Sequence, residues 1–167
     1  MLKLKGSLRQ RIDTAMSIAN VPVNIEDLNS FVELYFKANI KLLSSAKDFY
    51  CKYGGAFSRI WFEFEDSAYN KEFIFLFYSN LPISELEKIK RLKDTALDND
   101  MVKQFAGQEV CPVAEIGFYY PAFVYIGENS LLYCIHEYED EIRIFEKPED
   151  ILEYELSAHI PIGLTDK

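Results

Sequence analysis

Apolar residues recur along this chain with two different periods, and each period predicts one type of element. An interval of three or four positions marks one face of a helix, and it occurs in residues 8–19, 24–36, 44–53 and 84–105. Residues 59–65 instead alternate between apolar and polar, which predicts a strand with one buried face. Residues 73–78 are continuously apolar, which is typical of a strand covered on both faces. The helical faces predicted to be buried include Val32, Phe36, Leu86 and Leu97.

The stretch from Val110 to Phe145 predicts the sheet around which the rest of the chain is organised. Aromatic and β-branched residues fill its apolar segments, and turn-forming residues separate them. Three or four short strands are therefore expected, in residues 110–116, 122–126, 131–137 and 142–145. Residues 127–130, with the sequence GENS, fit a short hairpin loop.

Helix boundaries are marked by capping residues. Asn24 is suited to cap a helix, because its side chain can accept a hydrogen bond from the first turn. Ser84 and Glu87 form the capping-box pattern that begins a helix. Gly54-Gly55 is expected to end the helix before it, because glycine is common just past a helix C-terminus.

These elements predict an α+β fold: a single domain with a central, mostly antiparallel twisted sheet of about six strands, flanked by helices. Pro148 is expected to open a last helix, with acidic residues in its first turn. We divide the chain into an N-terminal helical extension (1–21), an α+β domain (22–160) and an irregular tail (161–167).

Charge is distributed unevenly along the chain. Its net charge is −9, and residues 107–167 contain thirteen Asp and Glu but only three Lys and Arg. Such an acidic segment repels nucleic acid and anionic lipid, so neither is an expected partner. It would attract a basic protein and speed their encounter. The alternative is that these acids keep an aromatic-rich protein soluble.

The chain has no apolar run long enough to span a bilayer. Its basic N-terminus is not followed by the apolar segment of a signal peptide, so a cytoplasmic location is expected. Cys51, Cys111 and Cys134 lie in apolar runs without metal or redox spacing. They are expected to be buried free thiols.

Candidate catalytic groups are few. Cys134 and His136 share one face of a predicted strand at roughly 7 Å, but no nucleophile elbow or oxyanion loop accompanies them. The carboxylates of residues 137–141 lack the glycine and alternating oxygen donors of a calcium loop. We therefore predict no enzyme activity, no metal site and no cofactor.

Aromatic and acidic side chains remain as candidates for binding a partner. Trp61 falls on the polar face of its predicted strand, so it is either covered by a helix or presented to a partner, and tryptophan is common at binding hot spots. Tyr119 lies between two predicted strands. The predicted partner-binding residues are Trp61, Glu63, Glu65, Tyr119, Glu137, Glu139 and Asp140.

The order of short motifs resembles that of the SUKH superfamily, and most closely that of its third subfamily. A helix leads into Tyr53-Gly54-Gly55 and a strand follows directly. After a long helix come the segments 112–115 (PVAE) and 126–129 (IGEN), and a short acidic helix closes the domain. Ala114 and Ser130 stand where the family usually has glycine. The resemblance extends over about residues 21–156.

The resemblance implies an α+β fold and a binding function without shared active-site residues. Bacterial members are mostly immunity proteins, which bind and neutralise a cognate toxin of a polymorphic or contact-dependent system, commonly a nuclease. The expected function is thus toxin neutralisation through an acidic and aromatic surface. The alternatives are a regulatory or scaffold interaction module of the same fold, and a small-molecule-binding protein. Self-association through a sheet edge also stays open.

Overall fold

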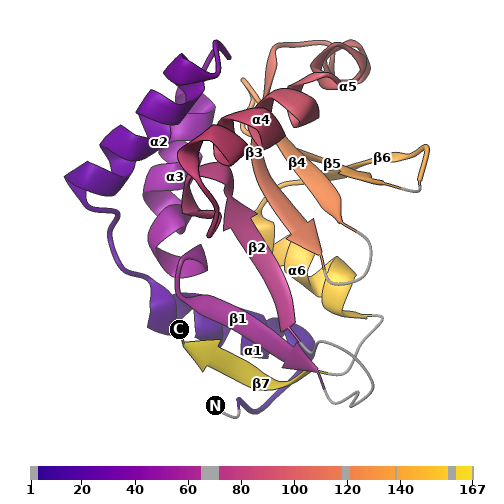
Figure 1. The fold of residues 1–167 in the computed structure, drawn as a ribbon. Coiled ribbons are helices and arrows are strands. Elements are labelled where there is room, and N and C mark those ends of the chain that lie inside the picture. Colours follow the sequence, from indigo (N-terminus) through magenta and orange to yellow (C-terminus); the bar gives the residue numbers. More distant parts are fainter. Residues whose placement is uncertain (1–3, 65–71, 118–120, 138, 158–160, 167) are drawn as a thin grey trace.

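The computed structural model describes residues 4–64, 72–117, 121–137, 139–157 and 161–166, with the backbone alone for 61–64, 72–73 and 161–166. Its centre is a seven-stranded sheet in the order β6-β5-β4-β3-β2-β1-β7, and all neighbouring strands are antiparallel (Figure 1). The expectation of an α+β fold built on an antiparallel sheet is confirmed.

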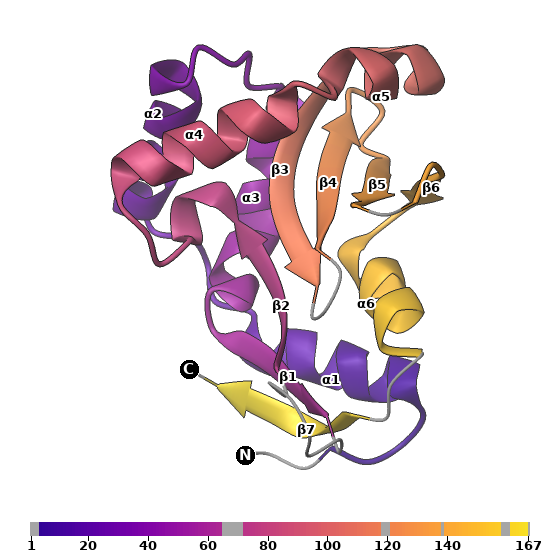
Figure 2. The ribbon, with the colours of Figure 1, turned by 45° about the vertical axis from the view of Figure 1, so that its right-hand side comes forward.

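The strands are β1 (Ile60–Phe64), β2 (Glu72–Phe77), β3 (Val110–Gly117), β4 (Ala122–Gly127), β5 (Leu132–His136), β6 (Ile142–Phe145) and β7 (Pro161–Asp166). The helices are α1 (Leu8–Ala19), α2 (Ile25–Lys37), α3 (Ser44–Phe57), α4 (Glu85–Ala96), α5 (Asn99–Ala106) and α6 (Pro148–Ser157). Helices α1, α3 and α6 lie on one side of the sheet, and α4 and α5 lie on the other (Figures 1 and 2).

The larger core lies between the sheet and helices α2 and α3, and its centre is aromatic. Phe31 stacks on Tyr50 with ring centroids 4.1 Å apart, and Phe57 stacks on Phe75 at 4.2 Å. Phe77 of β2 is fully buried among these rings. Aromatic side chains supply much buried area each, so this cluster fixes both helices on the sheet.

A smaller core lies on the opposite face, under α5. Val102 of α5 is fully buried there with Tyr125 of β4 and Tyr133 of β5. The Tyr125 hydroxyl donates a hydrogen bond to the carbonyl of Thr95 at the end of α4 (2.8 Å). A buried hydroxyl needs such a partner, so this bond ties the end of α4 to the sheet.

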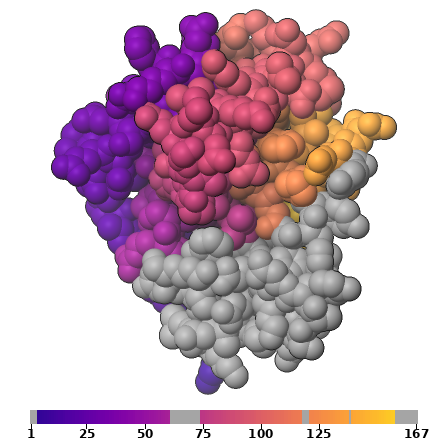
Figure 3. All heavy atoms as spheres, in the orientation of Figure 1, coloured from indigo at the N-terminus to yellow at the C-terminus, as the bar shows by residue number. Residues whose placement is uncertain are grey.

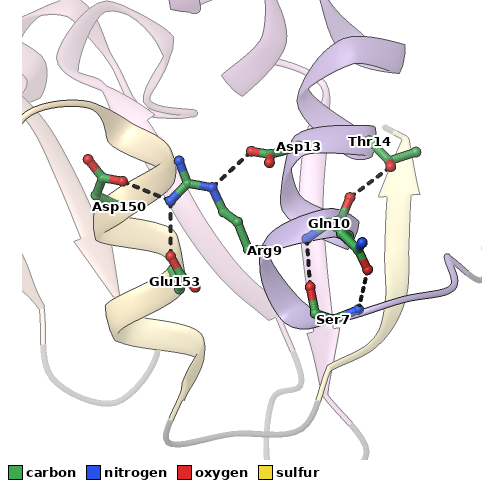
Figure 4. Close-up of polar contacts among 7 residues, drawn as sticks. All are labelled: Ser7, Arg9, Gln10, Asp13, Thr14, Asp150 and Glu153. Atoms are coloured by element: carbon green, nitrogen blue, oxygen red, sulfur yellow. Dashed lines mark hydrogen bonds and ion pairs between the residues drawn. The ribbon is translucent and has the colours of Figure 1, made fainter.

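Helix α1 is joined to α6 by ionic contacts (Figure 4). The Arg9 guanidinium donates hydrogen bonds to Asp150 (2.8 Å) and Glu153 (2.9 Å) of α6, and to Asp13 of its own helix (3.0 Å). The Ser7 hydroxyl caps α1 by accepting from the backbone N–H of Gln10. The predicted caps at Asn24 and Ser84 are likewise present.

The prediction that Gly54-Gly55 ends its helix is wrong, because α3 continues to Phe57. The structure gives these glycines a different role. A Cβ atom on Gly55 would lie 1.8 Å from the carbonyl oxygen of Val21, and one on Gly54 would lie 2.7 Å from the Tyr50 ring. Gly55 therefore allows α3 to pass close to the segment that joins α1 and α2, and Gly54 leaves room for the Tyr50 ring of the same helix.

The expectation of an irregular tail at 161–167 also differs from the structure. Pro161–Asp166 forms β7, which pairs with β1 along its length. Pro161 is the first residue of the strand, a position where the missing N–H is tolerated. Without β7, the backbone N–H and C=O groups along one edge of β1 would be unpaired, and β7 pairs with them. The local sequence of residues 161–166 did not predict this pairing.

Several side chains predicted to be buried are exposed instead. Phe36 of α2 is 84% exposed and Leu86 of α4 is 77% exposed. Val32 is 36% exposed, and Leu97 is 81% exposed. Helix α2 buries Phe31, Leu34 and Tyr35, a narrower face than the sequence period suggested, because its neighbours cover one side of it only.

We predict that Gly55→Ala destabilises the fold, although alanine is normally the better helix residue by about 1 kcal/mol. The close approach to the Val21 carbonyl should outweigh that gain, with a net loss of roughly 1–3 kcal/mol of unfolding free energy. Urea denaturation followed by circular dichroism measures the change.

Gly107→Ala is the matched control. Gly107 has a left-handed backbone with φ of 69°, and a Cβ atom added to it would have no neighbouring atom within 4 Å. This variant should lose only about 1 kcal/mol, from backbone strain. Equal losses in the two variants, or a more stable Gly55→Ala protein, would contradict the proposed role of the close approach.

Candidate functional site

The turn between β5 and β6 presents three of the predicted partner-binding residues together. Glu137, Glu139 and Asp140 are all exposed. The turn is anchored by its backbone, since the N–H of Glu137 donates to the carbonyl of Pro121 (3.1 Å) and that of Glu139 donates to the carbonyl of His136 (3.0 Å). The carboxylates are therefore held on an anchored hairpin at one edge of the sheet.

Arg143 of β6 compensates part of this charge. Its guanidinium donates a hydrogen bond to Glu139, lies 3.4 Å from a carboxylate oxygen of Glu141, and sits 4.7 Å from the centroid of the Tyr154 ring. The hydrogen bond from Arg143 lowers the pKa of Glu139. Among the described residues, Glu137 and Asp140 have no ion-pair partner. The hairpin thus keeps a negative surface at neutral pH.

A partly buried polar pair joins the end of β5 to α6. The Nε2 atom of His136 is hydrogen-bonded to Glu155 of α6, and its Nδ1 atom is 3.6 Å from a carboxylate oxygen of Glu139. Both His136 and Cys134 are buried in the strand. Burial, with the negative charge of Glu155 in addition, raises the pKa of the Cys134 thiol. Cys134 is therefore a protonated core side chain.

The remaining predicted residues do not join the hairpin. Trp61 and Glu63 lie on β1, opposite Thr165 and Gly163 of β7. Strand β1 is five positions from β6 in the sheet, which corresponds to roughly 24 Å at ordinary strand spacing. Glu65 and Tyr119 lie outside the described residues. The structure therefore brings together Glu137, Glu139 and Asp140 but separates them from Trp61 and Glu63.

Sequence reasoning missed a groove between α1, α3 and the start of α6. Two adjoining cavities of about 200 and 360 Å³ share Lys52 and Tyr53 in their walls. The smaller is also lined by Asp48 and Glu146, and the larger by Asp13 and Glu149. These carboxylates outnumber Lys52, so the groove favours a cationic group.

The Lys52 ammonium lies 5.1 Å from the centroid of the Tyr53 ring. Burial, followed by the charge of Glu149, raises the pKa of Tyr53, so its hydroxyl is neutral and can donate a hydrogen bond. No local motif signals this groove, because its walls come from segments that are distant in the chain.

Within the part of the chain that the structure describes, no three His, Cys, Asp or Glu side chains are arranged to hold a metal ion. The described helices include none with the length and apolar character required to cross a membrane.

Comparisons with protein-family models, curated proteins and solved structures found no match for this chain.

The prediction that all three cysteines are buried is wrong for Cys51, which is exposed on α3, whereas Cys111 and Cys134 are buried. Burial raises the pKa of Cys111 to about 12. We predict that one thiol reacts rapidly with dithionitrobenzoate in the native protein at pH 8, and that all three react in denaturant.

Cys51→Ser is the control for this measurement and should abolish the rapid phase while leaving two thiols in denaturant. Rapid reaction of two or more thiols in the native protein would show that the β3 or β5 side of the core opens readily, contrary to the packing described above.

Proposed function

We propose that this chain is a non-catalytic immunity protein of the SUKH type, which binds and neutralises a basic cognate toxin in the cytoplasm of the producing cell. The observation that carries the proposal is the anchored hairpin with the exposed carboxylates of Glu137, Glu139 and Asp140. A nuclease toxin is the expected target, because a nuclease must bind phosphate and its cleft is correspondingly electropositive. An acidic hairpin can occupy such a cleft in place of phosphate.

The conformation of Ser130 supports the family resemblance. The SUKH pattern usually has glycine at this hairpin position, and Ser130 has a left-handed backbone with φ of 66°. Glycine adopts that conformation at little cost, whereas other residues adopt it rarely. The backbone at this turn therefore has the left-handed conformation that glycine favours, although this chain has serine there.

The surroundings of Cys134 and His136 support binding rather than catalysis. The thiol is buried and its pKa is raised, so it is a poor nucleophile. His136 is engaged by Glu155 across the interface between β5 and α6. These two residues are accounted for by packing and by the attachment of α6 to the sheet.

Capture followed by neutralisation tests the proposal. The tagged chain is incubated at low salt with lysate and secreted proteins of the source cells, and the protein eluted at high salt is purified. A basic protein whose toxicity is suppressed by co-expression of this chain supports the proposal. A non-toxic regulator would favour the interaction module instead. Failure to retain any salt-sensitive basic protein would contradict toxin binding by an acidic surface.

For the captured toxin, we predict that Glu137→Lys with Asp140→Lys weakens binding at least about tenfold at low salt and flattens its dependence on salt. The reversed charges should lower the association rate in particular. This pair leaves the contact between Glu139 and Arg143 intact, so the hairpin keeps its internal ion pair. Surface plasmon resonance at several salt concentrations measures both effects.

The matched control is Glu26→Lys with Glu33→Lys, which makes the same change of net charge on α2. Glu26 and Glu33 are exposed on a helix remote in sequence from the hairpin. If both double variants weaken binding equally, net charge rather than the hairpin governs the interaction.

The groove at Lys52 and Tyr53 favours a second candidate, the binding of a small cationic molecule. Four carboxylates and the Tyr53 side chain line its walls, and ligand sites combine a concave shape with a few polar groups of this kind. Spermidine and agmatine are suitable probes. A rise in melting temperature that is lost in Glu149→Gln would support this candidate, whereas no shift with either probe would count against it.

A further inference from the structure

Helix α5 presents an unusual apolar stripe to solvent. Leu97 lies in the turn that precedes α5, and Met101 and Phe105 lie four residues apart on one side of the helix. They are 81%, 49% and 52% exposed, respectively. The other side of α5 buries Val102 completely against the sheet. The stripe therefore faces away from the core to which the helix is attached.

The stripe continues onto the edge of the sheet. The Phe105 ring contacts the Tyr133 ring of β5 edge to face, with centroids 6.3 Å apart. Tyr133 pairs with Ile144 of β6, and cross-strand partners project from the same face. Ile144 is 51% exposed. In Figure 3, α5 and the orange strands lie side by side at the upper right of the molecule. We call Leu97, Met101, Phe105 and Ile144 the α5–β6 patch.

The two chain segments that carry Met101, Phe105 and Ile144 are both acidic. Residues 98–109 carry three carboxylates and one basic side chain, Lys103, which is ion-paired with Glu109. Residues 137–144 carry four carboxylates and one basic side chain, Arg143, which is ion-paired with Glu139 and Glu141. Each segment thus contains an excess of negative charge, and the basic group in each is already paired.

We infer that the α5–β6 patch is the docking surface for the basic protein partner, with apolar side chains at its centre and carboxylates at its rim. This inference rests on the proposed function, and it extends the contact surface from the β5–β6 hairpin to α5. An apolar centre with a polar rim is the usual anatomy of a binding hot spot. The fitting partner presents an aliphatic or aromatic side chain flanked by arginine or lysine.

Charge favours a basic protein over a second copy of the chain as the partner that binds the α5–β6 patch. Two copies that met through the α5–β6 patch would bring their acidic rims together, and like charges at an interface oppose association. A basic partner would meet the same rims with complementary charge.

Charge also distinguishes this patch from the surface around Phe36 and Leu86, two of the most exposed apolar side chains. There the Lys37 ammonium lies 2.9 Å from Glu33 and 2.6 Å from Glu85, so positive and negative groups are interspersed. That surface has no comparable acidic rim and serves as the control site.

Panning a phage library of random twelve-residue peptides against the full-length chain tests the inference. The selected peptides should contain an aromatic or aliphatic residue flanked by arginine or lysine. Their affinity should fall at least tenfold in F105S/I144S and remain unchanged in F36S, which alters an even more exposed aromatic side chain. Circular dichroism melting of each variant checks that the fold is retained.

A second variant leaves the apolar side chains intact. Asp98→Asn with Asp100→Asn should weaken peptide binding at low salt by at least threefold and have less effect at high salt. Because Asp98 and Asp100 are exposed, this variant keeps the test valid even where F105S/I144S is less stable.

The inference is overturned if no peptide is enriched, if the selected peptides lack basic residues, or if their affinity is unchanged in F105S/I144S. Sedimentation analysis showing a dimer that F105S/I144S abolishes would assign the patch to a second copy instead. If F105S/I144S neutralises the toxin as well as the unaltered chain does, the proposed function stands and the α5–β6 patch is not the docking surface. If basic peptides bind at the patch but the chain neutralises no toxin, the patch is a docking surface and the proposed function is wrong.

Discussion

The packing of Phe77 is the interaction on which the rest of the structure depends. This side chain of β2 is fully buried, and its ring contacts rings from α2, from α3 and from its own strand. Helices α2 and α3 are thereby fixed against the centre of the sheet rather than against one another alone. Interiors are packed as densely as organic crystals, so a residue with this many aromatic neighbours leaves little freedom for the elements around it.

The close approach at Gly55 and the attachment of α1 follow from this arrangement. With α3 fixed against the sheet, the segment joining α1 and α2 passes over Gly55 with no room for a side chain. Helix α1 then reaches α6, where Arg9 contacts Asp150 and Glu153. The first and last helices, α1 and α6, are thus brought into the same layer, although surface ion pairs of this kind contribute little stability individually.

The two faces of the sheet are covered unequally, and this produces the surfaces to which we assign function. Helices α1, α2, α3 and α6 contribute to the larger core on one face, whereas the other face is covered by α4 and by α5, a helix of two turns (Figure 2). Helix α5 is anchored through Val102 and leaves Met101 and Phe105 exposed beside the sheet edge. The β5–β6 hairpin ends at the same edge. Exposed apolar side chains and acidic side chains therefore both occur at the edge of the sheet beside α5.

The sequence by itself determined most of the elements, but neither β7 nor the end of α3. Strand alternation, the caps at Asn24 and Ser84, and the turn at 127–130 act over a few residues, so they could be read directly. Part of the candidate site was accessible in the same way, since Glu137, Glu139 and Asp140 occupy one turn. Tertiary structure decided the rest. A helical period shows that Val32 and Phe36 lie on the same side of α2, but not how far a neighbouring element covers that side. Likewise the distance of Trp61 from the hairpin, the role of Gly55 and the α5–β6 patch depend on contacts between segments far apart in the chain.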